Sequence, residues 1–297
     1  MTRDVSRPFG RLLTAMITPF DAAGELDIAA AGALARYLVD EQACDGLVIN
    51  GTTGESPTTS DDEKRRMVAA VLDAVGDRAA VVAGVGTSDT AHSVKLAAAA
   101  AAEGAHGLLV VSPYYSKPPQ PFLVRHFTTI ADSTELPVML YDIPGRTGVP
   151  IETATLIELA THPRIVAVKD AKGDLYATQQ VMAATDLIIY NGVDELNLAA
   201  YALGAVGAVS VTSHLAGATI AAMFDAIDAG DLVTARRLND ELLPVTRGIM
   251  CRTQGLVAVK AALSARGLAT GSPRPPLFDA DDELRAAIEA DLKEAGR

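Results

Sequence analysis

The sequence predicts an α/β fold, namely a closed (β/α)8 TIM barrel followed by a C-terminal helical extension. Eight short apolar runs alternate with alanine-rich stretches of helical character, and no linker rich in proline, glycine and serine separates them. Most runs are continuously apolar, which predicts strands buried on both faces, as in a parallel sheet covered by helices. Eight strands, each followed by a helix, favour a barrel. An open doubly wound sheet is the alternative, but it usually has fewer strands and a glycine-rich first turn.

The predicted strands are, in chain order, Leu12–Thr18, Gly46–Asn50, Ala80–Ala83, Gly107–Val111, Pro137–Tyr141, Ile165–Lys169, Leu187–Asn191 and Gly207–Val211. The barrel is expected to occupy residues 1–225 as the catalytic domain. Residues 226–297 are expected to form the helical extension, with a break at Gly271–Pro276. No flexible linker precedes the extension, so it is interpreted as part of the same unit.

Two helix starts are marked by capping residues. Thr59 or Ser60 is expected to cap the helix after the second strand, because a hydroxyl accepts from free backbone N–H groups. The carboxylates of Asp61–Glu63 favour its first turn, where the helix dipole is positive. Asp89 and Thr90 indicate the same kind of start for the helix after the third strand.

Composition and charge exclude several classes of function. The chain has 37 acidic and 25 basic residues and a net charge of −12, so nucleic acid is not an expected partner. Cys44 and Cys251 form neither a disulfide framework nor a thiolate metal site, which predicts a reducing, cytoplasmic environment. Residues 1–9 lack the apolar core of a signal peptide, and no run of 18 apolar residues is present, so no membrane association is expected.

A metal centre is not expected from the sequence. Asp170 and Asp194 do not complete a ligand set, and the histidines are scattered without ligand spacing. The sequence also lacks a phosphate-loop lysine motif and a dinucleotide-binding fingerprint. The five histidines, read as structural or solvated, are His92, His106, His126, His162 and His214.

Lys169 is the strongest candidate for a catalytic residue, because it lies at a predicted strand end and the active sites of TIM barrels lie where the strands end. It closes the apolar run Ile165–Val168, and its strand position directs the amine toward the barrel mouth or interior. Burial disfavours the charged form of an amine, and an amine must lose its extra proton before it attacks a ketone. The alternative is an ordinary surface lysine.

Other polar residues end neighbouring strands. Gly51–Glu55 could bind a carboxylate through backbone N–H groups and two hydroxyls. The alternative is an ordinary connection between a strand and a helix, in which Glu55 only forms hydrogen bonds with backbone groups beneath the loop. Tyr141 and Tyr115 could relay protons, while core packing explains most single tyrosines equally well. Arg146 lies in a loop bracketed by proline and glycine, which suits a bidentate carboxylate contact or an ordinary ion pair.

Together these residues resemble the dihydrodipicolinate synthase and N-acetylneuraminate lyase superfamily. Four motifs occur in the order and at the spacing of that family, across residues 11 to about 212. The C-terminal stretches Arg252–Gly255 and Arg274–Leu277 are also similar to family members. The four motifs are Gly51–Glu55, Ser112–Tyr115, Tyr141–Gly148 and Val168–Asp170.

The resemblance implies a Schiff-base aldolase that needs no separate cofactor. Lys169 would form an imine with pyruvate, and the iminium would make the pyruvate methyl group acidic enough to give an enamine. Tyr141 would transfer protons, linked through the Thr52 hydroxyl to Tyr115. In the family this second tyrosine reaches the site of the neighbouring subunit, which implies a homotetramer built as a dimer of dimers.

The remaining roles implied by the resemblance concern binding. Thr53, together with Thr52, would hold the pyruvate carboxylate. Gly192 and Val209 would line the pyruvate pocket, and Arg146 would receive the carboxylate of the incoming aldehyde at the entrance.

All members of the superfamily make the same enamine, so the second carbonyl partner distinguishes them. Thr52, Thr53 and Arg146 resemble the synthase branch, which joins pyruvate to L-aspartate 4-semialdehyde in lysine and diaminopimelate synthesis. Two enzymatic alternatives are a 2-keto-3-deoxy sugar-acid aldolase and an N-acetylneuraminate lyase. A keto-acid-binding paralogue without activity is the alternative from another class, although it would be expected to carry a damaged site.

Two departures from the family pattern are present. The seventh strand ends in Tyr190–Asp194, where synthases often carry Ser-Gly-Asp-Asp. Lysine-inhibited relatives place a carboxylate near the position of His92, and here Lys64 and Ser88 occupy neighbouring positions. Weak or absent inhibition by L-lysine is therefore predicted.

Overall fold

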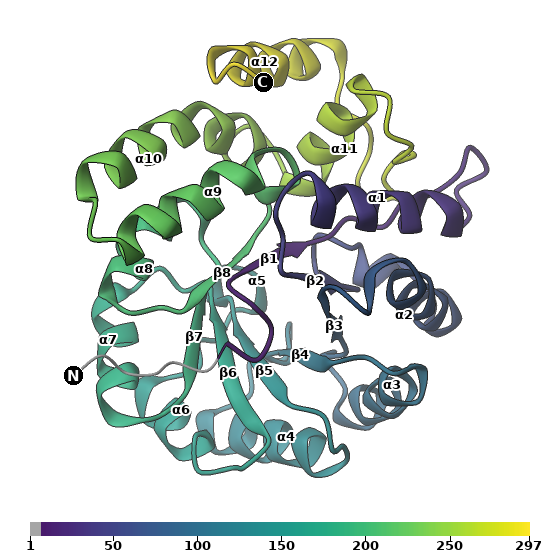
Figure 1. The fold of residues 1–297 in the computed structure, drawn as a ribbon. Helices are drawn as coiled ribbons and strands as arrows, with labels where there is room; N and C mark the ends of the chain where they lie inside the picture. The colour runs from purple at the N-terminus through teal and green to yellow at the C-terminus, as the bar shows by residue number, and fades with distance from the viewer. Residues whose placement is uncertain (1–6) are drawn as a thin grey trace.

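A computed structural model describes residues 7–297. Its eight parallel strands close into one barrel in sequence order, which confirms the predicted TIM barrel (Figure 1). Each strand pairs with its sequence neighbours, and the last pairs with the first. The strands are β1 (Leu12–Ala15), β2 (Gly46–Ile49), β3 (Ala80–Gly84), β4 (Gly107–Val111), β5 (Val138–Asp142), β6 (Ile165–Asp170), β7 (Ile188–Asn191) and β8 (Gly207–Ser210).

All eight predicted strands exist, with ends that differ by up to three residues. The largest difference is in β1, which was predicted to reach Thr18 and ends at Ala15. The N–H of Ile17 donates to Nε2 of His214 rather than to a neighbouring strand, so the ladder stops there. A continuous apolar run does not reveal such a side-chain partner.

Side chains alternate between the barrel interior and the helix layer. In β6, Ala167 packs inside the barrel, whereas Val168 packs against the outer helices. Phe9 closes the bottom of the barrel, with its ring centroid 6.4 Å from that of Tyr190. The interior is therefore a packed core, as expected for this fold, and Lys169 belongs to the inward-facing set by alternation.

Helices surround the barrel and carry the predicted caps (Figure 1). Ser60 forms a reciprocal capping box with Glu63, and Asp89 caps the helix after β3. The barrel helices are α1 (Ile28–Asp40), η1 (Ser56–Thr58), α2 (Asp61–Val75), α3 (Thr90–Glu103), α4 (Gln120–Asp132), α5 (Pro144–Thr147), α6 (Thr153–Leu159), α7 (Leu175–Ala184), η2 (Asp194–Leu196), α8 (Asn197–Leu203) and α9 (Ser213–Asp228).

The C-terminal extension is helical, as predicted. It contains α10 (Leu232–Thr246), η3 (Arg247–Cys251), α11 (Gly255–Ala265) and α12 (Asp282–Glu294), and Figure 1 shows α10, α11 and α12 in the green to yellow C-terminal part of the chain. Asp291, with a side chain only 4% exposed, holds the extension together by ion pairs to Arg247 and Arg252. The proposed division after residue 225 falls within α9, and it remains a proposal.

Within residues 7–297, no helix combines the length and apolar character that crossing a bilayer requires.

Candidate active site

A cavity of about 370 Å³ opens where the strands end, on the face of the barrel where chemistry is expected. Its wall is largely apolar, with a few convergent hydroxyl groups and one guanidinium, a composition typical of small-molecule sites. The residues lining it are Asn50, Gly51, Thr52, Ser56, Pro57, Gly84, Gly86, Leu109, Val111, Tyr114, Tyr115, Tyr141, Ile143, Arg146 and Thr147.

Tyr141 lines this cavity, and Lys169 lies beside Tyr141 without lining the open space. They are register partners on β5 and β6, and each is 5% exposed. The Nζ of Lys169 lies 4.2 Å from the centroid of the Tyr141 ring. Because both side chains project from adjacent strands of a closed barrel, their relative position is fixed by the sheet rather than by a loop.

Gly192 permits the approach of Lys169. A Cβ on Gly192 would lie 3.1 Å from Cγ of Lys169 and 3.0 Å from Cβ of Ala171. Such contacts are tighter than side chains normally make, so a larger residue would displace the lysine stem. The departure of Tyr190–Asp194 from the family pattern therefore retains the residue that the lysine needs.

The loop Gly51–Thr59, which we call the hydroxyl loop, brings Thr52 to the cavity. The backbone is left-handed at Asn50, directly before this loop, and at Glu55 within it, both with φ of 56°. Gly84 of β3 makes room for the turn, since a Cβ there would lie 2.4 Å from the carbonyl oxygen of Asn50. Glu55 is buried, and one of its carboxylate oxygens accepts from the backbone N–H of Arg274. A hydrogen bond between Glu55 and a backbone group was the alternative interpretation of this residue.

Tyr115 combines an unusual backbone with almost complete exposure. Its φ is 76° and it is 94% exposed, although it also borders the cavity. A large aromatic side chain exposed to this degree is suited to contact with another molecule. Among residues 7–297, the Thr52 hydroxyl forms no hydrogen bond with Tyr141 or Tyr115 in this chain, so the relay remains a prediction.

Arg146 stands at the cavity rim on the short helix α5. Its Nη2 donates to Oε1 of Gln254, 2.9 Å away, in the turn before α11. The C-terminal extension therefore reaches the mouth of the site. Sequence reasoning missed Gln254, whose neighbourhood was noted as family-like without a role.

Asp142 secures the loop that carries Arg146. Its side chain is fully buried behind β5, accepts from the backbone N–H of Ile151 at 3.0 Å and pairs with Lys172 at 3.1 Å. Burial raises the pKa of Asp142, and Lys172 opposes that shift. Sequence reasoning also missed this pair, although a carboxylate directly after Tyr141 could have indicated it.

Thr53, Gly192, Val209 and Lys169 are not among the residues that line the open cavity. Val209 is buried in the barrel interior with Tyr141, so it lies in the core beneath the site. Within residues 7–297, no three side chains of the metal-ligating types are grouped. The roles assigned to these residues stay predictions.

Known proteins with similar sequences and structures share this architecture. The dihydrodipicolinate synthetase family matches residues 8–295. The chain belongs to this family. A 4-hydroxy-tetrahydrodipicolinate synthase from Kineococcus radiotolerans is 63% identical, with 98% of this chain and 94% of the relative covered.

Solved structures of family members agree with the fold. A dihydrodipicolinate synthase from Bacillus anthracis is 39% identical and superimposes with a TM-score of 0.94, covering 97% of this chain and 98% of its own. A chloride-inhibited dihydrodipicolinate synthase from Acinetobacter baumannii, complexed with pyruvate, is 32% identical with a TM-score of 0.93. It covers 97% of this chain and 99% of its own. The superfamily resemblance drawn from the four motifs is thereby confirmed.

Proposed function

We propose that this chain is a 4-hydroxy-tetrahydrodipicolinate synthase that condenses pyruvate with L-aspartate 4-semialdehyde. The observation that carries the proposal is the placement of Lys169 beside Tyr141, both nearly buried, beneath a cavity bordered by Thr52 and Arg146. A relative that is 63% identical bears this name, and a family structure holds pyruvate, which supports the assignment.

The first half-reaction uses the amine and the phenol together. Thr52 and Thr53 hold the pyruvate carboxylate through hydroxyl and backbone N–H groups, and the amine of Lys169 attacks the ketone carbon. Loss of water gives the iminium, which withdraws electrons from the pyruvate methyl group. Tyr141 then moves the proton whose removal produces the enamine.

In the second half-reaction, the enamine carbon attacks the aldehyde carbon, and the new alkoxide takes a proton. The amino group of the bound semialdehyde then displaces Lys169 from the imine carbon and closes the ring, which frees the lysine amine for another cycle. Arg146 binds the semialdehyde carboxylate at the rim, because a guanidinium offers two parallel donors to a carboxylate.

A homotetramer in the cytoplasm completes the proposal. The exposure of Tyr115 supports a subunit contact at the site, since this large aromatic side chain is 94% exposed within the described part of this chain. In a dimer this side chain would border the cavity of the partner and complete the proton relay.

A coupled assay tests the reaction. Purified protein is mixed with pyruvate and L-aspartate 4-semialdehyde, and the cyclic product is followed through a dihydrodipicolinate reductase. Cleavage of 2-keto-3-deoxy hexonates and of N-acetylneuraminate is measured in parallel. Fast coupled turnover with negligible cleavage is expected. Faster cleavage of a sugar acid would replace the synthase by the corresponding aldolase, and no turnover with any substrate would leave only a binding protein.

A further inference from the structure

The C-terminal extension contacts the hydroxyl loop through a buried ion pair and a partly buried hydrogen bond. Lys260 of α11 places its Nζ 2.7 Å from Oε1 of Glu55, and both side chains are 2% exposed. The second oxygen of the same carboxylate accepts from the backbone N–H of Arg274 at 2.8 Å. Both oxygens of the loop carboxylate are therefore held by residues of the extension.

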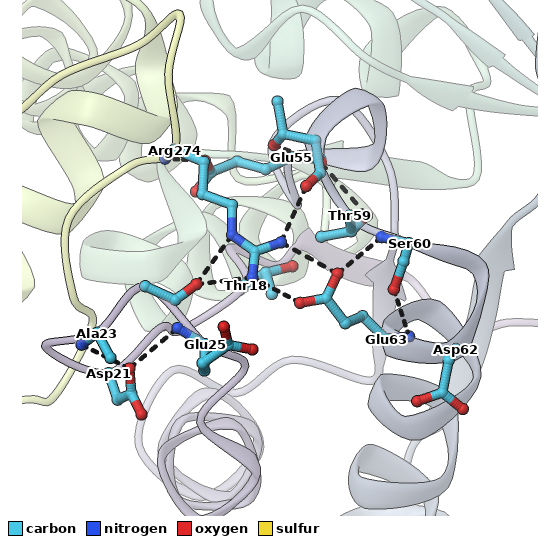
Figure 2. Close-up of polar contacts among 12 residues, drawn as sticks. Thr18, Asp21, Ala23, Glu25, Glu55, Thr59, Ser60, Asp62, Glu63 and Arg274 are labelled. Carbon is cyan, nitrogen blue, oxygen red and sulfur yellow. Dashed lines mark hydrogen bonds and ion pairs between the residues drawn. The ribbon is translucent and has the colours of Figure 1, made fainter.

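Arg274 adds a second attachment, shown in Figure 2. Its guanidinium donates to the carbonyl oxygens of Thr58, at 2.9 Å, and of Gly24, at 2.6 Å. It also forms two hydrogen bonds with the carboxylate of Glu63 at the start of α2, at 2.5 and 3.0 Å. One side chain thus links the extension to two loops and to a helix N-terminus.

The ring of Phe20 packs against the charged groups of both Lys260 and Arg274. Nζ of Lys260 lies 4.4 Å from the centroid of its ring, and Cζ of Arg274 lies 4.1 Å from it. The N–H of Phe20 donates to the carbonyl oxygen of Thr270 in the extension. Contact with an aromatic face stabilises a desolvated cation. The Phe20 ring therefore stabilises the charges of Lys260 and Arg274 and leaves both cations free to bind the carboxylates of the loop and of α2.

The contacts of Lys260 and Arg274 with Glu55 hold the strained part of the hydroxyl loop. Glu55 adopts a left-handed backbone with φ of 56°, which a residue with a side chain keeps only when its surroundings hold it. Its N–H donates to the carbonyl oxygen of Thr52, 3.2 Å away. A change in the position of Glu55 therefore moves the backbone of the residue that borders the cavity.

Stability alone does not account for this arrangement. A buried ion pair contributes little net free energy, because desolvation of the two charges offsets their attraction, and apolar residues of similar size often serve as well. Burial lowers the pKa of Lys260, and its interaction with Glu55 opposes that shift. The charges instead fix one geometry, since a carboxylate with both oxygens held has one favourable orientation.

We propose that Lys260 and Arg274 are positioning residues for pyruvate binding, acting through Glu55 to hold the hydroxyl loop in the shape that receives the substrate carboxylate. The inference rests on the proposed function, because it takes Thr52 and Thr53 as the groups that bind this carboxylate. The extension is then part of the binding machinery, although Lys260 and Arg274 are not among the residues that line the cavity.

The test replaces both partners of the ion pair, so that no unpaired charge remains buried. The double variant Lys260→Met with Glu55→Gln, and the single variant Lys260→Arg, are checked for folding by circular dichroism. The pyruvate concentration that gives half-maximal borohydride trapping on Lys169 is then measured. We expect the double variant to need about ten- to a hundred-fold more pyruvate, as for a small misplacement of binding groups. Lys260→Arg should retain most of the affinity.

The matched control is Asp291→Asn, which removes a carboxylate of similar burial elsewhere in the extension. It should lower thermal stability without changing the pyruvate requirement. An unchanged requirement in the folded double variant, or an equal increase in Asp291→Asn, would overturn the positioning role. Failure of the native protein to trap pyruvate would instead reject the proposed function, so the two failures are distinguishable.

Discussion

Nζ of Lys169 lies 4.2 Å from the ring centroid of Tyr141, its register partner on the adjacent strand. This relationship places an amine and a phenol in a nearly buried pair beneath the cavity. Adjacent parallel strands hold such a pair more rigidly than loops do. The chemistry of the site is therefore expected to depend on these two side chains in separable ways.

Tyr141→Phe is expected to slow turnover by about 10²–10⁴-fold, the usual contribution of a general acid or base. Pyruvate should still form a trappable imine, because the phenylalanine keeps the ring beside Lys169 and removes the proton-carrying oxygen alone. Steady-state rates and borohydride trapping on the same preparation measure the two effects. Unimpaired turnover would remove Tyr141 from the mechanism.

Arg146→Ala is expected to raise the KM for L-aspartate 4-semialdehyde far more than the KM for pyruvate. The guanidinium borders the cavity, whereas Lys169, on which pyruvate would be held, is nearly buried. Gln254→Leu should give a smaller change in the same direction, since it removes the acceptor that orients Arg146. Initial rates with each substrate varied in turn provide the test. Equal damage to both KM values would contradict the assignment.

Inhibition by L-lysine is expected to be weak or absent. The family resemblance implies a carboxylate near the position of His92 in lysine-inhibited relatives, whereas here the Nε2 of His92 contacts the carboxylate of Asp61 at 2.9 Å. Lys64 is nearly buried nearby, its Nζ donating to the carbonyl oxygen of Thr59. Its positive charge would repel the ammonium of an approaching lysine. Steady-state assays with added L-lysine decide the matter, and micromolar inhibition would refute it.

Acid should destabilise the fold partly through His214. This side chain is fully buried, and burial lowers its pKa to about 4, from about 6.5 in an unfolded chain. The unfolded chain therefore binds the proton first, so the contribution is complete above pH 6.5 and lost as pH falls toward 4. We expect His214 to account for about 2 kcal/mol of stability lost between pH 7 and pH 5.

Urea unfolding at these two pH values, at one protein concentration, measures that loss. His214→Gln should lower stability at pH 7 and flatten the change between pH 7 and pH 5. His92→Gln, at a side chain that is 39% exposed, serves as the control and should leave the change as it is. An equally steep change in both variants would exclude His214 as its source.

The sequence predicted the parts of the fold that depend on local pattern. The eight apolar runs indicated the strands, and the positions of Lys169 and Tyr141 at two strand ends placed both at the same rim. A cap at Thr59 or Ser60 was predicted because a helix start depends on a few adjacent residues, and Ser60 provides it. Such features can be predicted from the sequence because residues adjacent in the chain determine them.

Contacts between distant segments could not be predicted in the same way. Nothing in the residues around Gln254 indicates that its amide reaches Arg146, or that Lys260 pairs with Glu55. These pairs depend on how the extension packs onto the finished barrel, which no local period encodes. A lysine within the apolar run of α11 was a signal for a buried cation, but it could not name the partner.

Mass spectrometry after borohydride reduction tests whether Lys169 carries the pyruvate imine. The protein is incubated with pyruvate, reduced and digested, and the site of the covalent adduct is located. We expect one reduced pyruvate adduct on Lys169, its loss in Lys169→Ala, and its retention in Lys117→Met, which changes an exposed lysine in the loop after β4. An adduct that persists in Lys169→Ala, or no adduct in the native protein, would show that Lys169 does not form the imine.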